Sequence, residues 1–239
     1  MNHIEMTEVG SKMKNRAIIM NSFFVGMMLI GGLATSRVHA DGQVPLETEL
    51  PPPLTMGTPV PVNAPNLEPE DAWRSRPPVM VPENAANVAL NKTVTSSDEW
   101  PIIGELEYIT DGIKEGDEGN YVELGPGLQW VQIDLEQPYA IHAIAVWRFF
   151  SQDRAYHDVI IQTSNDPDFT SDVNTHFNND HDNSAGFGVG TDKAFIESHR
   201  GQVVPVDGVV ARFVRLYSRG NTANEMNHYI EVEVFGVEP

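Results

Sequence analysis

The chain has 239 residues, enough for one ordinary domain with extensions. Its 34 acidic residues against 15 Lys and Arg give a formal net charge of −19. A charge of this sign repels nucleic acids and disfavours binding to anionic membranes. The chain has no cysteine, which excludes disulfides, thiolate zinc sites and thiol nucleophiles.

Residues 1–40 are predicted to be a secretory signal peptide. A basic start precedes the mostly apolar residues 17–33, and Val38-His39-Ala40 offers small residues at the two positions that a signal peptidase reads. An uncleaved membrane anchor is the alternative, but a span needs about 20 apolar residues. Acidic residues are unusual in such a leader, so translation is predicted to start at Met13. Export without cysteines favours a bacterial protein that is secreted or held in the periplasm or cell envelope.

Residues 41–86 hold 11 of the 17 prolines. Each proline fixes its own φ and biases the preceding residue away from helix. The segment is therefore predicted to be an extended, semi-rigid linker or arm without regular structure and with few hydrogen bonds of its own. Its only aromatic residue, Trp73, either docks onto the neighbouring domain or stays exposed.

Residues 87–239 carry the signals of β-strands. In the segment 129–135, Val131, Ile133 and Leu135 alternate with polar residues, which is typical of a half-buried strand. Further strands are predicted at 141–149, 159–164, 209–218 and 229–235. No window shows a convincing helical period. The sequence thus predicts one all-β domain of two packed sheets, and its length disfavours an immunoglobulin-type sandwich.

The order of short motifs resembles the discoidin domains, the C-type domains of coagulation factors five and eight. The matching runs are Asn87–Lys92 with Thr93–Ser97, Ile109–Gly112, Trp130–Leu135, Ala211–Tyr217 and Glu231–Gly236. The resemblance implies a galactose-binding-like jelly-roll β-sandwich. The terminal disulfide of the animal members is missing, and the polar insertion 176–186 has no counterpart in the common pattern.

The resemblance also implies a structural Ca²⁺ between the Asp-Gly loop and the last strand, held by Asp111 and Glu231. The alternative is that Asp111 only shapes a turn and that Glu231 points outward to solvent. A second oxygen-rich loop places Asn178, Asp180 and Asp182 at alternating positions, as in the first half of an EF-hand loop. The later bidentate Glu is absent there, and Asn and Asp are common turn formers, so a plain turn is favoured.

A sugar site is predicted at the connection 150–157, which lies on the ligand-binding rim of the resembled family. Arg154 can donate to two hydroxyls, Tyr156 can stack on a pyranose face, and Asp153 or His157 can fix the orientation. The connection before the last strand adds polar side chains at Asn221, Asn224 and His228. The alternative is that Tyr156 and His157 form the buried start of the next strand.

No catalytic motif is present: the chain has no G-x-S-x-G, no H-E-x-x-H and no phosphate-binding glycine loop. We therefore predict a secreted, non-catalytic module that binds a glycan or glycoprotein through the rim loops of a calcium-supported jelly roll. The alternative is a structural or adhesion protein that binds a protein partner at the cell surface or matrix. Lipid binding is a third hypothesis, which the 25 acidic against 9 basic residues in 87–239 disfavour.

Overall fold

The computed structural model describes residues 42–239, apart from residues 55, 58–59 and 117–118. The predicted signal peptide therefore lies outside the described residues. The described residues form strands and loops with two short 3₁₀ helices, η1 (Ala72–Ser75) and η2 (Leu106–Thr110). The all-β prediction is confirmed. Within this described part, no helix combines the length and apolar character needed to cross a membrane.

Eleven strands run along the described chain. They are β1 (Gln43–Pro45), β2 (Met80–Pro82), β3 (Ala86–Asn87), β4 (Thr93–Ser96), β5 (Val122–Leu124), β6 (Gln129–Trp147), β7 (Ile160–Ser164), β8 (Asn174–Asn178), β9 (Gln202–Ser218), β10 (Asn227–Tyr229) and β11 (Glu231–Val237). All of their pairings are antiparallel. The predicted strands 129–135 and 141–149 are joined in the single long strand β6.

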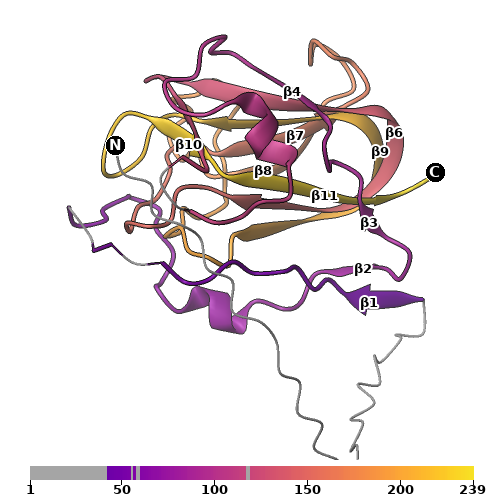
Figure 1. Cartoon of the computed structure of the whole chain (residues 1–239), viewed down its shortest axis with the longest axis horizontal. Coiled ribbons are helices and arrows are strands. Elements are labelled where there is room, and N and C mark those ends of the chain that lie inside the picture. The colour runs from indigo at the N-terminus through magenta and orange to yellow at the C-terminus, as the bar shows by residue number, and fades with distance from the viewer. Residues whose placement is uncertain (1–41, 55, 58–59, 117–118) are drawn as a thin grey trace, which may run out of the picture. The chain divides into compact units, whose positions relative to one another are not determined.

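Strands β6 and β9 cross both layers of the sandwich (Figure 1). The first half of β6 pairs with β4 and with the second half of β9, which also pairs with β7. The second half of β6 pairs with β11 and with the first half of β9. The register shifts between Asp134 and Tyr139, where Pro138 has no N–H to donate. One hydrogen-bonded sheet thus bends into two packed layers.

The hydrophobic core lies between these layers. Val131, Ile133 and Leu135 are fully buried, as their alternation predicts, and Val232 and Val234 of β11 join them. Apolar burial of this kind is the main favourable contribution to folding. The short strands β5 and β10 pair with each other, and Val122, Leu124 and Tyr229 from them belong to the core.

The proline-rich segment is packed against the sandwich, which corrects the prediction that it lacks regular structure. Strand β1 pairs with β2, so the segment closes on itself, and it runs along one side of the sandwich in Figure 1. The Met56 amide donates to the carbonyl of Ser151 at 2.6 Å, and the Glu68 amide to that of Ala194 at 2.8 Å. Trp73 lies under the guanidinium of Arg200, 3.8 Å from the ring centre. Extended backbone suits this packing because it lies flat along a surface.

Candidate functional site

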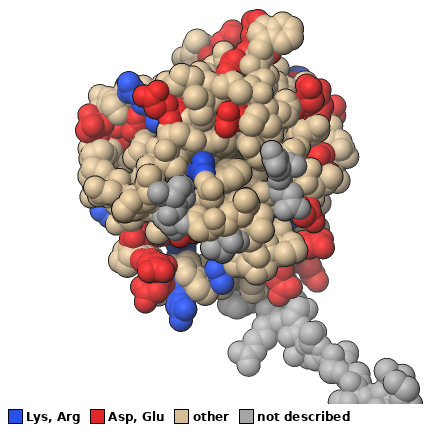
Figure 2. All heavy atoms as spheres, turned by 60° about the vertical axis from the view of Figure 1, so that its left-hand side comes forward, with Lys and Arg blue, Asp and Glu red and all other residues tan. Residues whose placement is uncertain are grey.

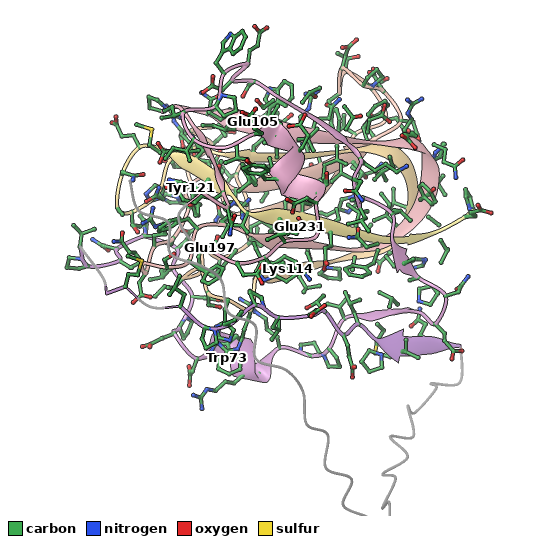
Figure 3. The ribbon with its side chains drawn as sticks, viewed as in Figure 1. Trp73, Glu105, Lys114, Tyr121, Glu197 and Glu231 are labelled. Carbon is green, nitrogen blue, oxygen red and sulfur yellow. The ribbon has the colours of Figure 1, made fainter. Side chains whose placement is uncertain are left out.

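Four rings gather at the end of the sandwich that β5 and β10 form. Tyr121 and Phe149 meet edge to face with ring centres 5.1 Å apart, and the His228 ring lies 5.7 and 5.6 Å from them. Tyr156 lies behind His228 at 5.9 Å. Tyr121 and Phe149 are half-buried, so both reach the surface. We call Tyr121, Glu123, Phe149, Arg154 and His228 the rim cluster; Figure 3 labels Tyr121.

A chain of hydrogen bonds fixes the polar groups of the rim cluster. The imidazole of His228 is bonded through Nδ1 to the Tyr156 hydroxyl at 2.8 Å and through Nε2 to Glu123 Oε2 at 2.9 Å. Burial lowers the pKa of His228 to about 3, so the ring is neutral at physiological pH. A neutral ring donates from one nitrogen only, and the arrangement in which Nε2–H donates to the carboxylate and Nδ1 accepts from the hydroxyl satisfies both bonds.

Arg154 lies over the face of Phe149, with its guanidinium carbon 4.3 Å from the ring centre. Its Nη2 donates to Gln152 Oε1 at 3.0 Å, and the side chain is buried. Burial raises the pKa of Glu123, and the charge of Arg154 opposes this rise. The rim cluster therefore combines a stacked cation, two accessible rings and one fixed carboxylate.

Gly104 holds the loop beside Tyr121 in place. Its φ of +76° is in the left-handed region, and a Cβ there would lie 2.3 Å from the carbonyl oxygen of Tyr121. We expect Gly104→Ala to destabilise the fold by at least about 1–3 kcal/mol from backbone strain alone, with the steric clash in addition. Gly127→Ala is the control, because its φ is +89° but nothing lies within 4 Å of the added carbon. Urea unfolding of both variants checks this, and equal losses would show that the clash is absent.

The structure brings together only part of the predicted sugar site. Arg154 and His228 belong to the rim cluster, and Asp153 directly precedes Arg154 in the connection between β6 and β7. Tyr156 is only 1% exposed and part of the core, so the prediction that it stacks on a sugar is wrong, and the alternative of a buried residue is confirmed for it. His157 lines a separate hollow of about 350 Å³, and Asn224 folds its own turn by accepting from the Met226 amide at 3.0 Å.

Sequence reasoning missed three members of the rim cluster, Tyr121, Glu123 and Phe149. Glu123 bonds to a histidine 105 residues away, because β5 pairs with β10 in the register that sets Glu123 opposite His228. No local spacing encodes a pair this distant. A sequence signal for the two rings is that an aromatic residue lies shortly before β6, at Tyr121, and another shortly after it, at Phe149.

The predicted calcium residues Asp111 and Glu231 do lie together. The Gly112 amide donates to Glu231 Oε2 at 3.1 Å, while Glu231 Oε1 is buried and has no hydrogen-bond partner. Burial, with the charges of Glu233 and Asp111 adding to it, raises the pKa of Glu231 to about 9. Burial also raises the pKa of Asp111, whose Oδ1 accepts from the Ile113 amide at 2.8 Å. A buried carboxylate oxygen without a partner beside a second carboxylate is a site that a hard cation fits.

The second predicted metal loop is arranged differently. Asp158, which the sequence analysis did not include, joins Asp180 and Asp182, with carboxylate oxygens within 4.8 Å of one another. Asp180 already accepts hydrogen bonds from the Ser184 and Ala185 amides, and Asp182 also accepts from Ser184. The third predicted residue, Asn178, accepts through its Oδ1 from the Asp180 amide at 2.9 Å. These bonds are those of a well-formed turn.

No family model and no curated protein sequence matches the chain. Similar solved structures include a chitosan-binding module from a chitosanase/glucanase of Paenibacillus sp. IK-5, at 20% identity and TM-score 0.47, over 64% of this chain and 100% of the module. A fucose-binding module of Streptococcus pneumoniae aligns at 16% identity and TM-score 0.45, over 64% of this chain and 99% of the module. A Clostridium perfringens CBM32 module, in complex with GlcNAc-α-1,4-galactose, aligns at 14% identity and TM-score 0.47, over 65% of this chain and 97% of the module. At this distance the ligands of these modules do not transfer to the chain.

Proposed function

We propose that the chain is a non-catalytic glycan-binding module whose ligand lies against the rim cluster. The observation that carries the proposal is the pairing of two accessible rings, Tyr121 and Phe149, with a carboxylate whose position His228 fixes. Sugar sites need a flat apolar surface for the C–H face of a pyranose and a few fixed polar groups for its hydroxyls. Because Glu123 is held by a neutral histidine inside a hydrogen-bonded chain, it is suited to accept from a hydroxyl rather than to transfer protons.

The charge of the surface supports a neutral ligand. Figure 2 shows acidic side chains scattered over the face in view, with few basic ones between them. Arg154 is the cation of the rim cluster, and its guanidinium is already stacked on Phe149 and bonded to Gln152. Anionic partners, nucleic acids among them, would be repelled by this surface. Export by the leader in residues 1–40 would place the module where glycans are found.

Replacing Glu123 by glutamine tests the rim cluster. Glu123→Gln keeps the shape and can still accept from His228, but a charge-assisted hydrogen bond to a sugar hydroxyl becomes a neutral one, which is roughly half as strong. We expect a loss of about 1 kcal/mol, or about fivefold in affinity, in calorimetric titration with the best ligand of a glycan array. The thermal midpoint should not fall, because a partly buried carboxylate is removed.

The exposed Glu105, labelled in Figure 3, provides the matched control. Glu105→Gln makes the same chemical change outside the rim cluster and should leave the affinity unchanged. Chitosan fragments and fucose, the ligands named for two similar modules, are the first sugars to include. If Glu123→Gln and Glu105→Gln bind as tightly as the unmodified protein, the ligand does not contact Glu123. Capture of a protein partner that free sugar does not displace would favour the adhesion alternative.

We further propose that Asp111 and Glu231 hold a structural Ca²⁺, with carbonyl oxygens of the Asp-Gly loop supplying further ligands. The unpartnered Oε1 of Glu231 supports this site, because a bound cation would compensate a carboxylate that burial otherwise disfavours. The ion would supply positive charge and hold the loop against β11. The loop of Asp180 and Asp182 is the less favoured position, since its own amides already use those oxygens.

A further inference from the structure

Lys114 connects the Asp-Gly loop to the last strand. Its Nζ lies 2.7 Å from Glu233 Oε1 and 4.3 Å from the ring centre of Trp147. The side chain is 7% exposed, although lysine is rarely buried unless it is paired. Three residues earlier, Asp111 contributes its carboxylate to the proposed calcium site. The short segment 111–114 therefore carries both an ion-pair anchor and a proposed metal ligand.

The same ammonium group holds the proline-rich arm. Lys114 Nζ donates to the backbone carbonyl of Glu49 at 2.9 Å. In Figure 3 Glu231 is labelled at β11, and Lys114 is labelled just below it, on the side toward the arm. The arm and the loop also line a common hollow of about 220 Å³, which is formed by Glu49, Leu50, Pro51 and Pro52 on the arm side and by Gly112, Lys114 and Glu115 on the loop side. Lys114 is thus shared between the arm and the sandwich.

A second set of contacts fixes the arm beside this loop. Leu54 packs against the cluster of buried residues that includes Trp147 and Phe150. The Ser151 carbonyl accepts from the Met56 amide at 2.6 Å, while the Ser151 hydroxyl donates to the Gly116 carbonyl at 2.8 Å. The far end of the loop and the arm are therefore connected through one serine. A shift of either segment would disturb the other.

We propose that Lys114 is a positioning residue for the calcium site, and that residues 49–54 and Met56 of the arm dock more tightly when the ion is bound. This inference rests on the proposed Ca²⁺ at Asp111 and Glu231. The ion would bind Asp111 and the arm contacts Lys114 in the same short loop, so ordering of this loop by one reduces the entropy cost of binding the other. Such coupling is reciprocal: Ca²⁺ strengthens arm docking by the same factor as arm docking strengthens Ca²⁺ binding.

The sign of the change in Ca²⁺ affinity on replacing Lys114 distinguishes a positioning role from a purely electrostatic one. A lysine that acts only as a nearby positive charge weakens Ca²⁺ binding, so Lys114→Met would then tighten it. A positioning lysine predicts the opposite, a Ca²⁺ dissociation constant raised by at least about fivefold, the lower end of typical couplings. Lys114→Arg, which keeps a donor and the charge, should restore most of the affinity. Lys193→Met, at an exposed site, is the control for the loss of one lysine.

The contribution of the arm to Ca²⁺ binding is tested with Leu54→Asn in the mature chain. Both side chains are uncharged, so this change weakens arm packing without altering the charge near the ion. We expect calorimetry to show weaker Ca²⁺ binding by at least about fivefold, and no change for Val60→Asn on the exposed part of the arm. Endoproteinase Glu-C, which needs no metal, should cleave after Glu47 and Glu49 at least about fivefold more slowly with saturating Ca²⁺ than with chelator. Calcium protection should disappear in Lys114→Met.

The possible failures are distinguishable. If millimolar Ca²⁺ gives no binding heat with the unmodified protein, the calcium site itself is refuted, and the coupling with it. If Ca²⁺ binds equally well to the unmodified protein and to Leu54→Asn, and does not change the rate of Glu-C cleavage, the site stands and the coupling is refuted. Tighter binding by Lys114→Met would leave Lys114 as a repelling charge and overturn its positioning role.

Discussion

Glu197→Ala is expected to destabilise the protein by about 3–5 kcal/mol, the range for breaking a buried ion pair. Glu197 and Arg148 are 2% and 0% exposed, with Oε1 and Nη1 3.6 Å apart, too far for a hydrogen bond. Arg148 lies between the rings of Tyr156 and Tyr229, at 5.4 and 5.1 Å. Arginine does not release its proton in proteins, so removing Glu197 leaves a buried charge without a counter-charge.

Removal of the arginine from this pair should destabilise the protein less than removal of the glutamate. Burial raises the pKa of Glu197 to about 7, so this carboxyl can become neutral when its partner is lost. We expect Arg148→Met, which still fills the space between the two rings, to lose less than Glu197→Ala. The double variant Arg148→Met with Glu197→Leu should be as stable as the unmodified protein or more so. Urea unfolding curves of the three variants check this order, and a loss below about 1 kcal/mol for Glu197→Ala would contradict it.

The same pair predicts a pH dependence. The folded pKa of Glu197 lies above its ordinary value of 4.5, so its contribution to stability is fully present below pH 4.5 and is lost as the pH rises toward 7. The slope for one such group can reach about 1.4 kcal/mol per pH unit. Glutamine mimics the neutral carboxyl, so the unfolding free energies of the unmodified protein and Glu197→Gln should be similar near pH 4.5 and diverge as the pH rises toward 7, with the unmodified protein falling. Parallel curves would show that Glu197 does not titrate there.

Calcium is expected to raise the thermal midpoint by about 5–10 °C. A ligand that binds only the folded state at 100 times its dissociation constant adds about 2.7 kcal/mol, which gives such a shift for a domain of this size. Glu231→Gln should abolish the response without destabilising the calcium-free protein, because it removes a buried carboxylate oxygen that has no partner. Differential scanning calorimetry with Ca²⁺ and with chelator checks both effects.

Asp182→Asn is the matched control for the calcium measurement, since it removes one carboxylate from the other acidic loop. It should keep the full calcium response. If Asp182→Asn loses the response and Glu231→Gln keeps it, the ion belongs to the group of Asp158, Asp180 and Asp182 instead. Superimposable melts of the unmodified protein with and without Ca²⁺ would refute both positions.

The sequence could predict what depends on local pattern. The alternation of Val131, Ile133 and Leu135 identifies a strand and its inner face, and the structure confirms both. The alternation in residues 229–235 predicts that Glu231 and Glu233 share the face opposite Val232 and Val234, but it does not predict that both carboxylates are buried. That burial depends on contacts from other segments, such as the bond from Gly112 to Glu231 and the ion pair from Lys114 to Glu233.

Contacts between segments far apart in the sequence account for the other differences between the predicted and the observed structure. The segment 136–138 has the composition of a turn, yet the hydrogen-bond ladder continues past it and makes β6 one strand. Glu123 and His228 meet only because β5 and β10 pair. Proline content predicts the backbone shape of the arm, because it restricts φ, but it does not predict the surface on which the arm lies. That surface is set by side chains such as Trp147, far along the sequence.

The arm is covalently continuous with the sandwich through β2 and β3, and this changes what its docking requires. Residues 49–54 behave as a tethered ligand, present at an effective concentration in the millimolar range. The contacts of Lys114 and Leu54 therefore need only modest intrinsic affinity to keep the arm closed. A free peptide of the same sequence would have to reach a comparable concentration to compete. Detachment of these residues would expose the face around Trp147, and the covalent tether favours their return to it.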